Sequence, residues 1–383
     1  MSRRADRLLL ALVIALAAAG VVAVASQSRS ARLAADFTVD YSAGVLLREG
    51  RLAAPYQQAE LARTIRAVAP DSGIDQRLPY NLPLAAALPY AALSLLPLEA
   101  AFRLFQAISL GLVMAVVLLL QSAASLGRRA PLFAALGTLA AVPVWATLTE
   151  GQPTAFVLTG AGLVVVCLRF RLIGLAALGG GLLAVKPQYL PAYLAILLAA
   201  REWRLLLAAL VGGTLMLLSP LAGGPGALLA MLHNALLVNE LVSLHINESW
   251  VGLLAVALPT GVATTAAVLL DGTALLALAW VGWRRPSNLI AYAAIAGVLA
   301  VIASPHALPH DLILLAVPSW LTVRLQRDGQ LPDLLRVWVL VDLALIVDLH
   351  GVPVPLAPIA LTLLLGYIAL RLHRTNDIQA MAA

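Results

Sequence analysis

Asp36 and Asp40 are two carboxylates that could act in the same site. They are four residues apart and lie just beyond the first apolar stretch of the chain. If their segment is helical, this spacing places both side chains on one face. Apolar surroundings raise the pKa of a carboxylate toward the range in which it serves as a general base. Aspartate is also a preferred N-cap, and from these residues alone a cap at Asp36 is the simpler explanation.

Lys186 is the only lysine in the sequence, and the other 24 of its 25 Lys and Arg residues are arginine. It ends the glycine-rich run GLAALGGGLLAVKPQ and is followed by Pro187, Gln188 and Tyr189. An ammonium group in this position can hold a phosphate, and a lysine snorkelling from a helix end is the plainer alternative. Anion binding is the better interpretation, because exposed positive charge elsewhere in the sequence is supplied by arginine.

His306, His310 and Asp311 lie together in the segment ASPHALPHDLILL. A histidine beside a carboxylate can carry protons or bind phosphate. Metal binding by the two histidines is the rival interpretation, but Pro305 and Pro309 argue against a regular helix that would align them. A His-x-x-x-His pair without the glutamate of a zinc protease is also a weak motif. Phosphate contact and simple helix capping are therefore both favoured over a metal.

A polar turn, Glu150-Gly151-Gln152-Pro153, separates two apolar runs. Its Glu or Gln side chain would hydrogen-bond sugar hydroxyls if the turn lined a cavity, although ordinary turn chemistry explains the same residues. The sequence has no Walker loop, no G-x-G-x-x-G at a strand–helix junction and no G-x-S-x-G. Nothing therefore supports nucleotide hydrolysis, a dinucleotide cofactor or a serine hydrolase.

The composition of the chain indicates the class of protein in which these residues lie. The chain has 383 residues, of which 62% are hydrophobic and 11% charged, and its mean hydropathy is +0.94. These values exclude an ordinary soluble domain and predict an all-α, polytopic membrane protein. The net charge of +6 marks topology and not nucleic-acid binding, because the arginines stand at the ends of apolar runs. The single cysteine, Cys167, excludes an intramolecular disulfide.

Two kinds of turn alternate along the apolar runs. The basic turns hold Arg128-Arg129, Arg169/Arg171, Arg201/Arg204, Arg284-Arg285, Arg324/Arg327 and Arg371/Arg374. The turns of the second kind hold Glu150-Gly151-Gln152, Lys186-Pro187-Gln188, Asn247 to Trp250, Ser304 to His306, and Asp348-Leu349-His350. Short loops rich in Lys and Arg stay cytoplasmic. We therefore expect the second kind of turn, and the working site, on the extracytoplasmic face of the plasma (inner) membrane.

Hydropathy predicts a single membrane domain over residues 1–383 with about 12 transmembrane helices and both termini cytoplasmic. The expected spans are 8–26, kept as an uncleaved anchor, then 100–122, 131–148, 153–168, 171–186, 188–200, 204–220, 262–283, 288–303, 307–324, 335–349 and 353–371. The proline-rich segment 79–97 is interpreted as partly inserted or as half of a broken span.

Two outward segments, 27–80 and 222–261, are too long and too polar to be turns. We expect short interfacial helices in the first. In the second, Trp250 is a candidate anchor at the headgroup level.

Taken in order, the motifs resemble glycosyltransferase family 87, the polyprenol-phosphate-mannose-dependent mannosyltransferases. The similar segments are DFTVDYSAGVLLREGRLAAPY, YNLPLAAALPYAALSLLPLEAAFRLFQ, VPVWATLTEGQPTAF, GLAALGGGLLAVKPQYLP, REWR, NESWVGLL and SPHALPHDLILLAVPSW. The chain departs from the family pattern at Asn81 and Leu82, which interrupt a Tyr-Pro-Pro-Leu stretch. Phe105 and Leu308 also stand where the family has tryptophan. Each motif is short, but together and in this order they form a much stronger signal.

This resemblance implies a GT-C-type bundle and an inverting transfer of a hexose, most often mannose. The donor would be a polyprenyl-phosphate sugar and the acceptor a hydroxyl of a glycolipid or glycan. Asp36 would be the general base, although Asp40 replaces a usual aromatic residue and either aspartate could serve. Lys186 and His310 would hold the departing phosphate. The other polar residues expected to contact substrate are Asp40, Tyr41, Glu150, Gln152, Gln188, Asn247 and His306.

The resemblance implies neither a cofactor nor an obligatory metal, and the expected partners are the lipid-linked donor, the acceptor and membrane lipid. A multispan transporter or flippase is the rival hypothesis, since polar residues at broken helices also describe a substrate path. A transporter should show charged groups near the bilayer midplane and two related halves. Here the polar groups gather toward one face and no internal repeat is found, so a glycosyltransferase is the better interpretation than a transporter. A catalytically silent scaffold is the other rival.

Overall fold

The computed structural model describes residues 3–70, 72–74, 77–124, 130–241, 246–284, 288–331, 334–349 and 354–382. Throughout these ranges the secondary structure is helical, with α-helices and short 3-10 helices and no strand. The predicted all-α class is therefore confirmed. Four predicted topology residues, Arg128, Arg129, Arg285 and His350, lie outside the described ranges.

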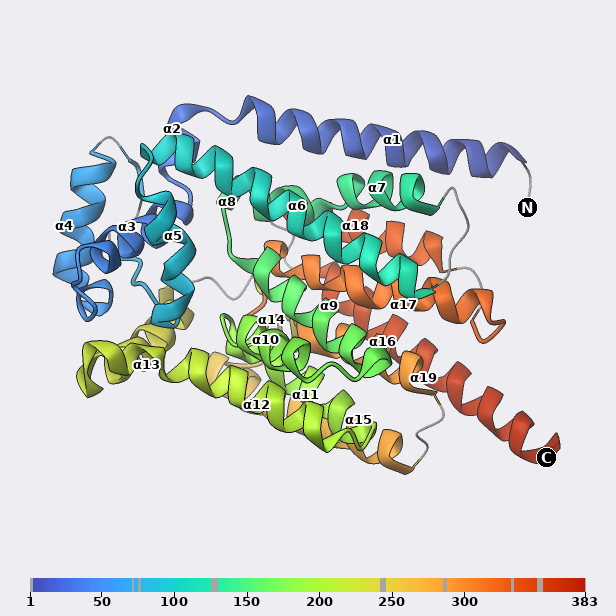
Figure 1. Ribbon diagram of the computed structural model, residues 1–383. Helices are drawn as coiled ribbons and strands as arrows, with labels where there is room; N and C mark the ends of the chain where they lie inside the picture. The colour runs from blue at the N-terminus through green and yellow to red at the C-terminus, as the bar shows by residue number, and fades with distance from the viewer. Residues whose placement is uncertain are drawn as a thin grey trace.

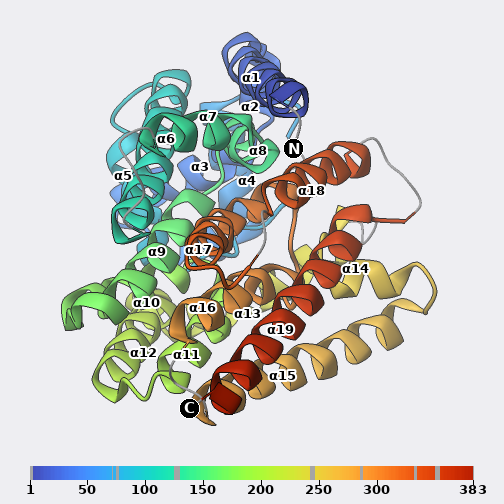
Figure 2. The same ribbon diagram turned by 90° about the vertical axis from the view of Figure 1, so that its right-hand side faces the viewer.

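Most helices run side by side in one bundle (Figure 1). They are α1 (Arg3–Ser26), α6 (Leu98–Ala124), α7 (Ala130–Ala140), α8 (Val142–Glu150), α9 (Thr154–Phe170), α10 (Ile173–Leu183), α11 (Leu190–Ala199), α12 (Trp203–Leu218), α15 (Thr260–Arg284), α16 (Leu289–Ile302), α17 (Ala316–Arg327), α18 (Leu335–Asp348) and α19 (Leu356–Ala382). Figure 2 shows α1 at one edge of the bundle and the pair α15 and α19 at the other.

Three helical segments of the described chain are long and apolar enough to cross a membrane: Leu98–Gln121, Trp203–Gly223 and Thr260–Arg284. Several shorter apolar helices, of 10 to 17 residues, accompany them. Shorter helices are tolerated where protein surrounds them or where the bilayer thins. The chain is thus a helical membrane protein, while the expected number of about 12 crossings stays a prediction.

Some of the expected spans are not continuous α-helices, as two examples show. Segment 131–148 divides into α7 and α8 at Ala141, whose backbone is extended at ψ 121° two residues before Pro143. Segment 307–324 begins with a 3-10 helix, η7 (Pro309–Leu315), before α17. Proline accounts for both breaks, because it lacks the N–H of the helical hydrogen bond and restricts the residue before it.

Segment 79–97 forms η2 (Leu84–Ala87) and α5 (Leu88–Leu93). These helices of four and six residues are too short to span a bilayer. They pack against α3 (Phe37–Arg48), where Gly44 is required because a Cβ there would lie 2.4 Å from the Tyr90 carbonyl carbon.

A lobe of short helices covers one end of the bundle, and both termini lie at the opposite end (Figure 1). Besides α3, η2 and α5, this lobe contains α2 (Arg29–Leu33), η1 (Ala54–Tyr56) and α4 (Gln58–Val68). The short helices predicted for 27–80 are therefore present. In α4, Leu61 and Ile65 are buried while Arg63 is exposed, so this helix is amphipathic.

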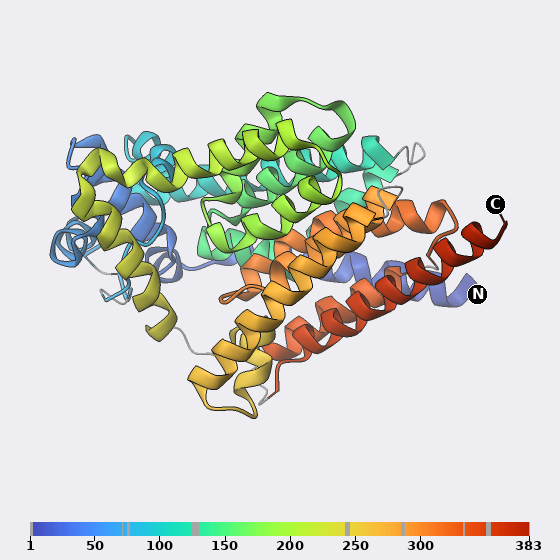
Figure 3. The ribbon, with the colours of Figure 1, turned by 90° about the horizontal axis from the view of Figure 1, so that it is seen from below.

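The second long segment supplies η4 (Ser219–Gly223), α13 (Pro225–Leu241) and α14 (Trp250–Ala255). Figure 3 shows α13 beside the lobe, and the side chain of Asn234 on α13 donates to the carbonyl oxygens of Tyr56 and Tyr80. The expectation that Trp250 anchors at the headgroup level is wrong. This tryptophan is buried, and its ring nitrogen donates to Thr362 of α19 at 2.9 Å.

The basic turns interlock away from the lobe. Arg171, after α9, pairs with Glu202 at 2.9 Å. Arg201, after α11, donates to the Trp283 carbonyl at 2.9 Å and stacks on the Trp283 ring at 4.5 Å. Both arginines have positive φ, 53° and 57°, and end their helices in the left-handed conformation. The charge pattern that predicted one common side for these turns thus corresponds to direct contact among three of them.

Candidate active site

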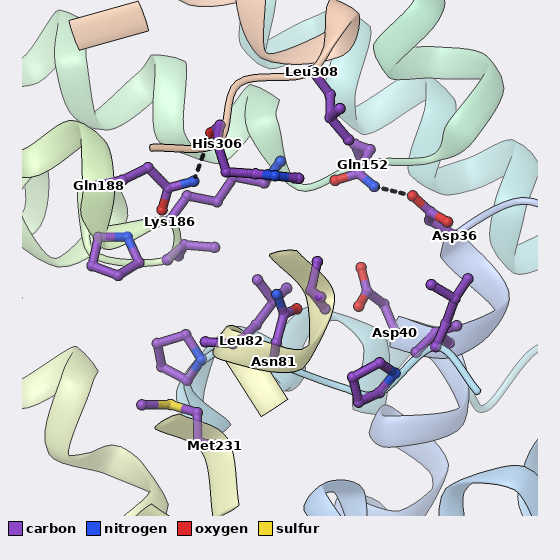
Figure 4. Close-up of a pocket in the computed structure, with 18 of the residues that line it drawn as sticks. Asp36, Asp40, Asn81, Leu82, Gln152, Lys186, Gln188, Met231, His306 and Leu308 are labelled. Atoms are coloured by element: carbon purple, nitrogen blue, oxygen red, sulfur yellow. Dashed lines mark hydrogen bonds between the residues drawn. The ribbon is translucent and has the colours of Figure 1, made fainter. Parts of the chain in front are cut away.

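A cavity of about 420 Å³ lies where the lobe meets the bundle. Five parts of the chain line it: the start of α3, residues 78–83, the turn after α8, the turn after α10 and the loop before η7. Residues of α12 and α13 close another side. Figure 4 shows polar side chains entering this cavity from several directions. Polar residues more than 250 positions apart in the sequence therefore share one cavity.

Asp36 stands at the N-cap position of α3, but its side chain makes no capping hydrogen bond. The amide of Gln152 instead donates to the Asp36 carboxylate (Figure 4). The interpretation of Asp36 as only a helix cap is therefore wrong. Asp40 follows one turn later on the same helix and also lines the cavity, as the four-residue spacing predicted.

Burial raises the pKa of Asp36, while the hydrogen bond from Gln152 and the charge of Lys186 oppose this rise. Burial also raises the pKa of Asp40, to about 8, and the negative charge of Asp36 adds to the shift. Two neighbouring carboxylates in a poorly hydrated site do not both ionise easily. The negative charge of Asp36 raises the pKa of Asp40, so the pair takes its first negative charge on Asp36, the less buried of the two.

Gly151 shapes the turn that delivers Gln152. It ends α8 in the left-handed conformation, with φ 64° and ψ 35°. A Cβ at this position would lie 2.5 Å from the Phe102 ring and 2.6 Å from Phe37. Only glycine meets both demands without a shift of its neighbours. The aromatic cluster around Phe37 thus fixes Asp36 and the turn of Gln152 together.

Lys186 reaches the cavity from the turn after α10. Its Nζ lies 2.6 Å from Asp311 Oδ1 and 3.3 Å from His310 Nε2. Asp311 is fully buried and also accepts hydrogen bonds from the Thr154 hydroxyl and the Leu308 backbone N–H, each at 3.1 Å. The ammonium group is therefore oriented by a carboxylate that compensates its charge. This wall of the cavity therefore presents a lysine that is paired with a carboxylate.

The close approach of α10 to α12 holds this turn in place. A Cβ at Gly180 would lie 2.1 Å from the Ala209 carbonyl oxygen, and one at Gly212 would lie 1.9 Å from that of Ala177. Small residues permit such contact between helix backbones in membranes. The glycine-rich run before Lys186 therefore serves helix packing, and the packing sets the position of the lysine.

His306 and His310 both line the cavity. The carbonyl oxygen of His306 accepts from Ser304 at 2.7 Å and from Gln188 at 3.4 Å, while that of His310 accepts from Thr147 at 3.0 Å. These bonds hold the backbone of both histidines and leave the His306 ring facing the cavity. Among the described residues, no three His, Cys, Asp or Glu side chains gather as a metal-binding group.

Three predicted substrate contacts, Tyr41, Glu150 and Asn247, are not among the residues that line the cavity. The Tyr41 hydroxyl donates to the Leu96 carbonyl at 2.8 Å, and Glu150 is exposed at the end of α8. Asn247 is buried and bonds the backbone at residues 305 and 307, each at 3.1 Å. Its side chain thus fixes the loop that carries His306.

The cavity also contains residues that the sequence did not single out as site residues. Asn81 enters from the proline-rich segment of the lobe. The apolar wall consists of Leu217, Met231, Leu232, Ala235, Leu236 and Val238. Apolar residues on a membrane helix look alike whether they face lipid, protein or a ligand, so no local signal could have found this wall. Asn81 had one signal, an amide among prolines in an otherwise apolar stretch.

Comparison with known proteins gives one match. The family model of glycosyltransferase family 87 matches residues 80–305, which is more than half of the chain. The matched range begins within the cavity lining and includes Gln152, Lys186 and Gln188. Neither the curated proteins nor the solved structures contain a match to this sequence.

Proposed function

Because the chain belongs to glycosyltransferase family 87, we propose that it transfers a hexose, most simply mannose, from a polyprenyl-phosphate donor to an acceptor hydroxyl. The reaction takes place on the extracytoplasmic face of the plasma membrane and inverts the anomeric centre. The acceptor is a glycolipid or a glycan. One observation carries the proposal: a single cavity has an aspartate with a raised pKa on one side and a lysine–histidine pair on the other.

Asp36 is the general base of this proposal. One carboxylate oxygen accepts from Gln152, and the other is available for the acceptor hydroxyl. Asp36 removes the hydroxyl proton as the acceptor oxygen attacks the anomeric carbon from the face opposite the phosphate. The bond from that carbon to the phosphate oxygen breaks, and its electron pair leaves with the phosphate. A base with a raised pKa suits this step, because its basicity is closer to the operating pH.

Lys186 and His310 serve the departing phosphate. Negative charge grows on its oxygens as the glycosidic bond breaks, and a fixed cation in a poorly hydrated site stabilises that charge strongly. Asp311 and His310 each accept from one N–H of the ammonium group, which leaves its third N–H for the phosphate. The His310 Nε2 atom, 3.3 Å from Nζ, accepts from the ammonium group, so the N–H of the other ring nitrogen is the second donor for the phosphate. Asp311 is thus a positioning residue that fixes where the cation points.

The apolar wall suits the isoprenoid part of the donor. Leu232 and Leu236 on α13 line the cavity and are also 51% and 65% exposed on the surface of the protein. A chain that extends from the cavity along these residues would reach membrane lipid without crossing polar surface. Burial of apolar groups then contributes to donor binding without any specific polar contact.

The test is an assay of the purified protein with radiolabelled polyprenyl-phosphate mannose and a panel of lipid and glycan acceptors. Wild-type protein should transfer the label, and the anomeric configuration of the product should be opposite to that of the donor. Asp36→Asn should abolish transfer while the protein stays folded and inserted. Undiminished transfer by Asp36→Asn would remove it as the base, and movement of the donor across vesicles without transfer would favour a flippase.

A further inference from the structure

Asn81 is a polar group of the cavity that the proposed reaction leaves unused. The other amides are committed within the protein: Gln152 donates to Asp36, and Gln188 donates to the His306 carbonyl. The Asn81 side chain lines the cavity, is partly exposed to it, and has no hydrogen bond to any residue that the structure describes. An amide in a cavity that makes no hydrogen bond within the protein can donate to and accept from a bound ligand.

The backbone on both sides of Asn81 is held firmly. Asn234 of α13 donates to the Tyr80 carbonyl at 3.0 Å, and the Tyr56 hydroxyl donates to the Leu82 carbonyl at 2.9 Å. The Tyr80 hydroxyl in turn donates to the Pro83 carbonyl at 3.2 Å. The amide is therefore presented from a fixed backbone, so ligand binding has to order only the side chain of Asn81.

The position of Asn81 in the cavity indicates which part of the substrate it contacts. Figure 4 shows its amide pointing into the space between the two aspartates on one side and Lys186 and Gln188 on the other. In the proposed reaction the acceptor hydroxyl lies at Asp36 and the donor phosphate at Lys186. The transferred sugar therefore lies between these two groups, next to Asn81. An amide both donates and accepts, as a hydroxyl does, and carries no charge that would compete for the phosphate.

We propose that Asn81 hydrogen-bonds a hydroxyl of the transferred sugar and so takes part in sugar selection. This assignment rests on the proposed hexosyl transfer. It identifies the ligand of Asn81 as a neutral polyol ring, and it separates Asn81 from the groups that bind phosphate or remove the acceptor proton.

The experiment compares wild type and Asn81→Ala on polyprenyl-phosphate mannose and on its four analogues, each with one ring or C6 hydroxyl replaced by hydrogen. In wild type, the analogue that lacks the bonded hydroxyl should lose roughly three- to tenfold in kcat/KM, the value of one neutral hydrogen bond. Asn81→Ala should lose a similar factor on the full donor and show no further loss on that one analogue. The acceptor KM should not change.

The control is Asn288→Ala, which removes an amide that bonds Gln330 at 3.2 Å and does not line the cavity. This variant should keep the wild-type response to every analogue. The assignment to the sugar is overturned if Asn81→Ala responds to all four analogues as wild type does, or if only the acceptor KM changes. Failure of the proposed function gives a different result, because wild type would then transfer no sugar from any of these donors.

Discussion

The buried pair of Lys186 and Asp311 allows a sharp test of what holds the phosphate side of the cavity. Asp311 is fully buried and the Lys186 side chain is 11% exposed, with 2.6 Å between Nζ and Oδ1. Removal of one partner of such a pair leaves a buried charge without compensation, which costs about 3–5 kcal/mol of stability. Asp311→Asn keeps the shape of the side chain and removes only its charge, so the loss should fall in that range.

The matched control is the pair of Arg324 and Asp328, whose atoms are 2.8 Å apart but whose side chains are 29% and 33% exposed. Solvent screens this pair, so Asp328→Asn should cost no more than about 1 kcal/mol. Unfolding of both variants is followed by circular dichroism in the same detergent. The double variant Lys186→Met/Asp311→Asn, which removes both charges, should regain most of the stability that Asp311→Asn loses.

Transfer activity separates the role of Asp311 from its effect on stability. The double variant should remain without efficient transfer although it is stable, because it lacks the cation that the phosphate needs. The reasoning is refuted if Asp311→Asn loses no more stability than Asp328→Asn. It is also refuted if the stable double variant transfers sugar at the wild-type rate, since the ion pair would then serve neither the fold nor the reaction.

Three further predictions concern the same cavity. Lys186→Ala should raise the donor KM and lower kcat, because a phosphate contact serves both binding and departure; unchanged steady-state constants would show that this lysine does not contact the phosphate. Gly151→Ala should cost about 1–3 kcal/mol through the crowding of Phe37 and the strained φ and should lower kcat, as measured by unfolding and transfer assays; wild-type values of both would contradict the geometry of the turn. Transfer should fall as the pH falls through the raised pKa of Asp36, because a base must be ionised to accept a proton. Gln152→Ala removes a hydrogen bond that lowers this pKa, so its acid limb should move to higher pH; a limb that stays in place or moves to lower pH would show that Gln152 does not control this carboxylate.

The sequence by itself determined the class of the protein and the local arrangement of its helices. Hydropathy gave the apolar helices, and charge at their ends indicated which turns gather at one end of the bundle. The four-residue spacing of Asp36 and Asp40 was enough to place both on one side of α3. Lys186 could also be recognised as unusual, because it is the only lysine in a sequence that otherwise uses arginine for its permanent positive charges. These features depend on residues within a turn or two of one another, where helical periodicity relates sequence directly to position.

Only the tertiary structure decided what each group contacts. Asp36 and Gln152 are 116 positions apart, and Lys186 and Asp311 are 125 positions apart. No local pattern relates such pairs, so the compensated charge of Lys186 could not be predicted, nor could the release of Asp36 from helix capping. The same holds for Trp250, which faces Thr362 and not the headgroups, and for the amide of Asn81. A pKa, a paired charge and an uncommitted amide all depend on burial and on distant neighbours, and these arise only when the helices pack.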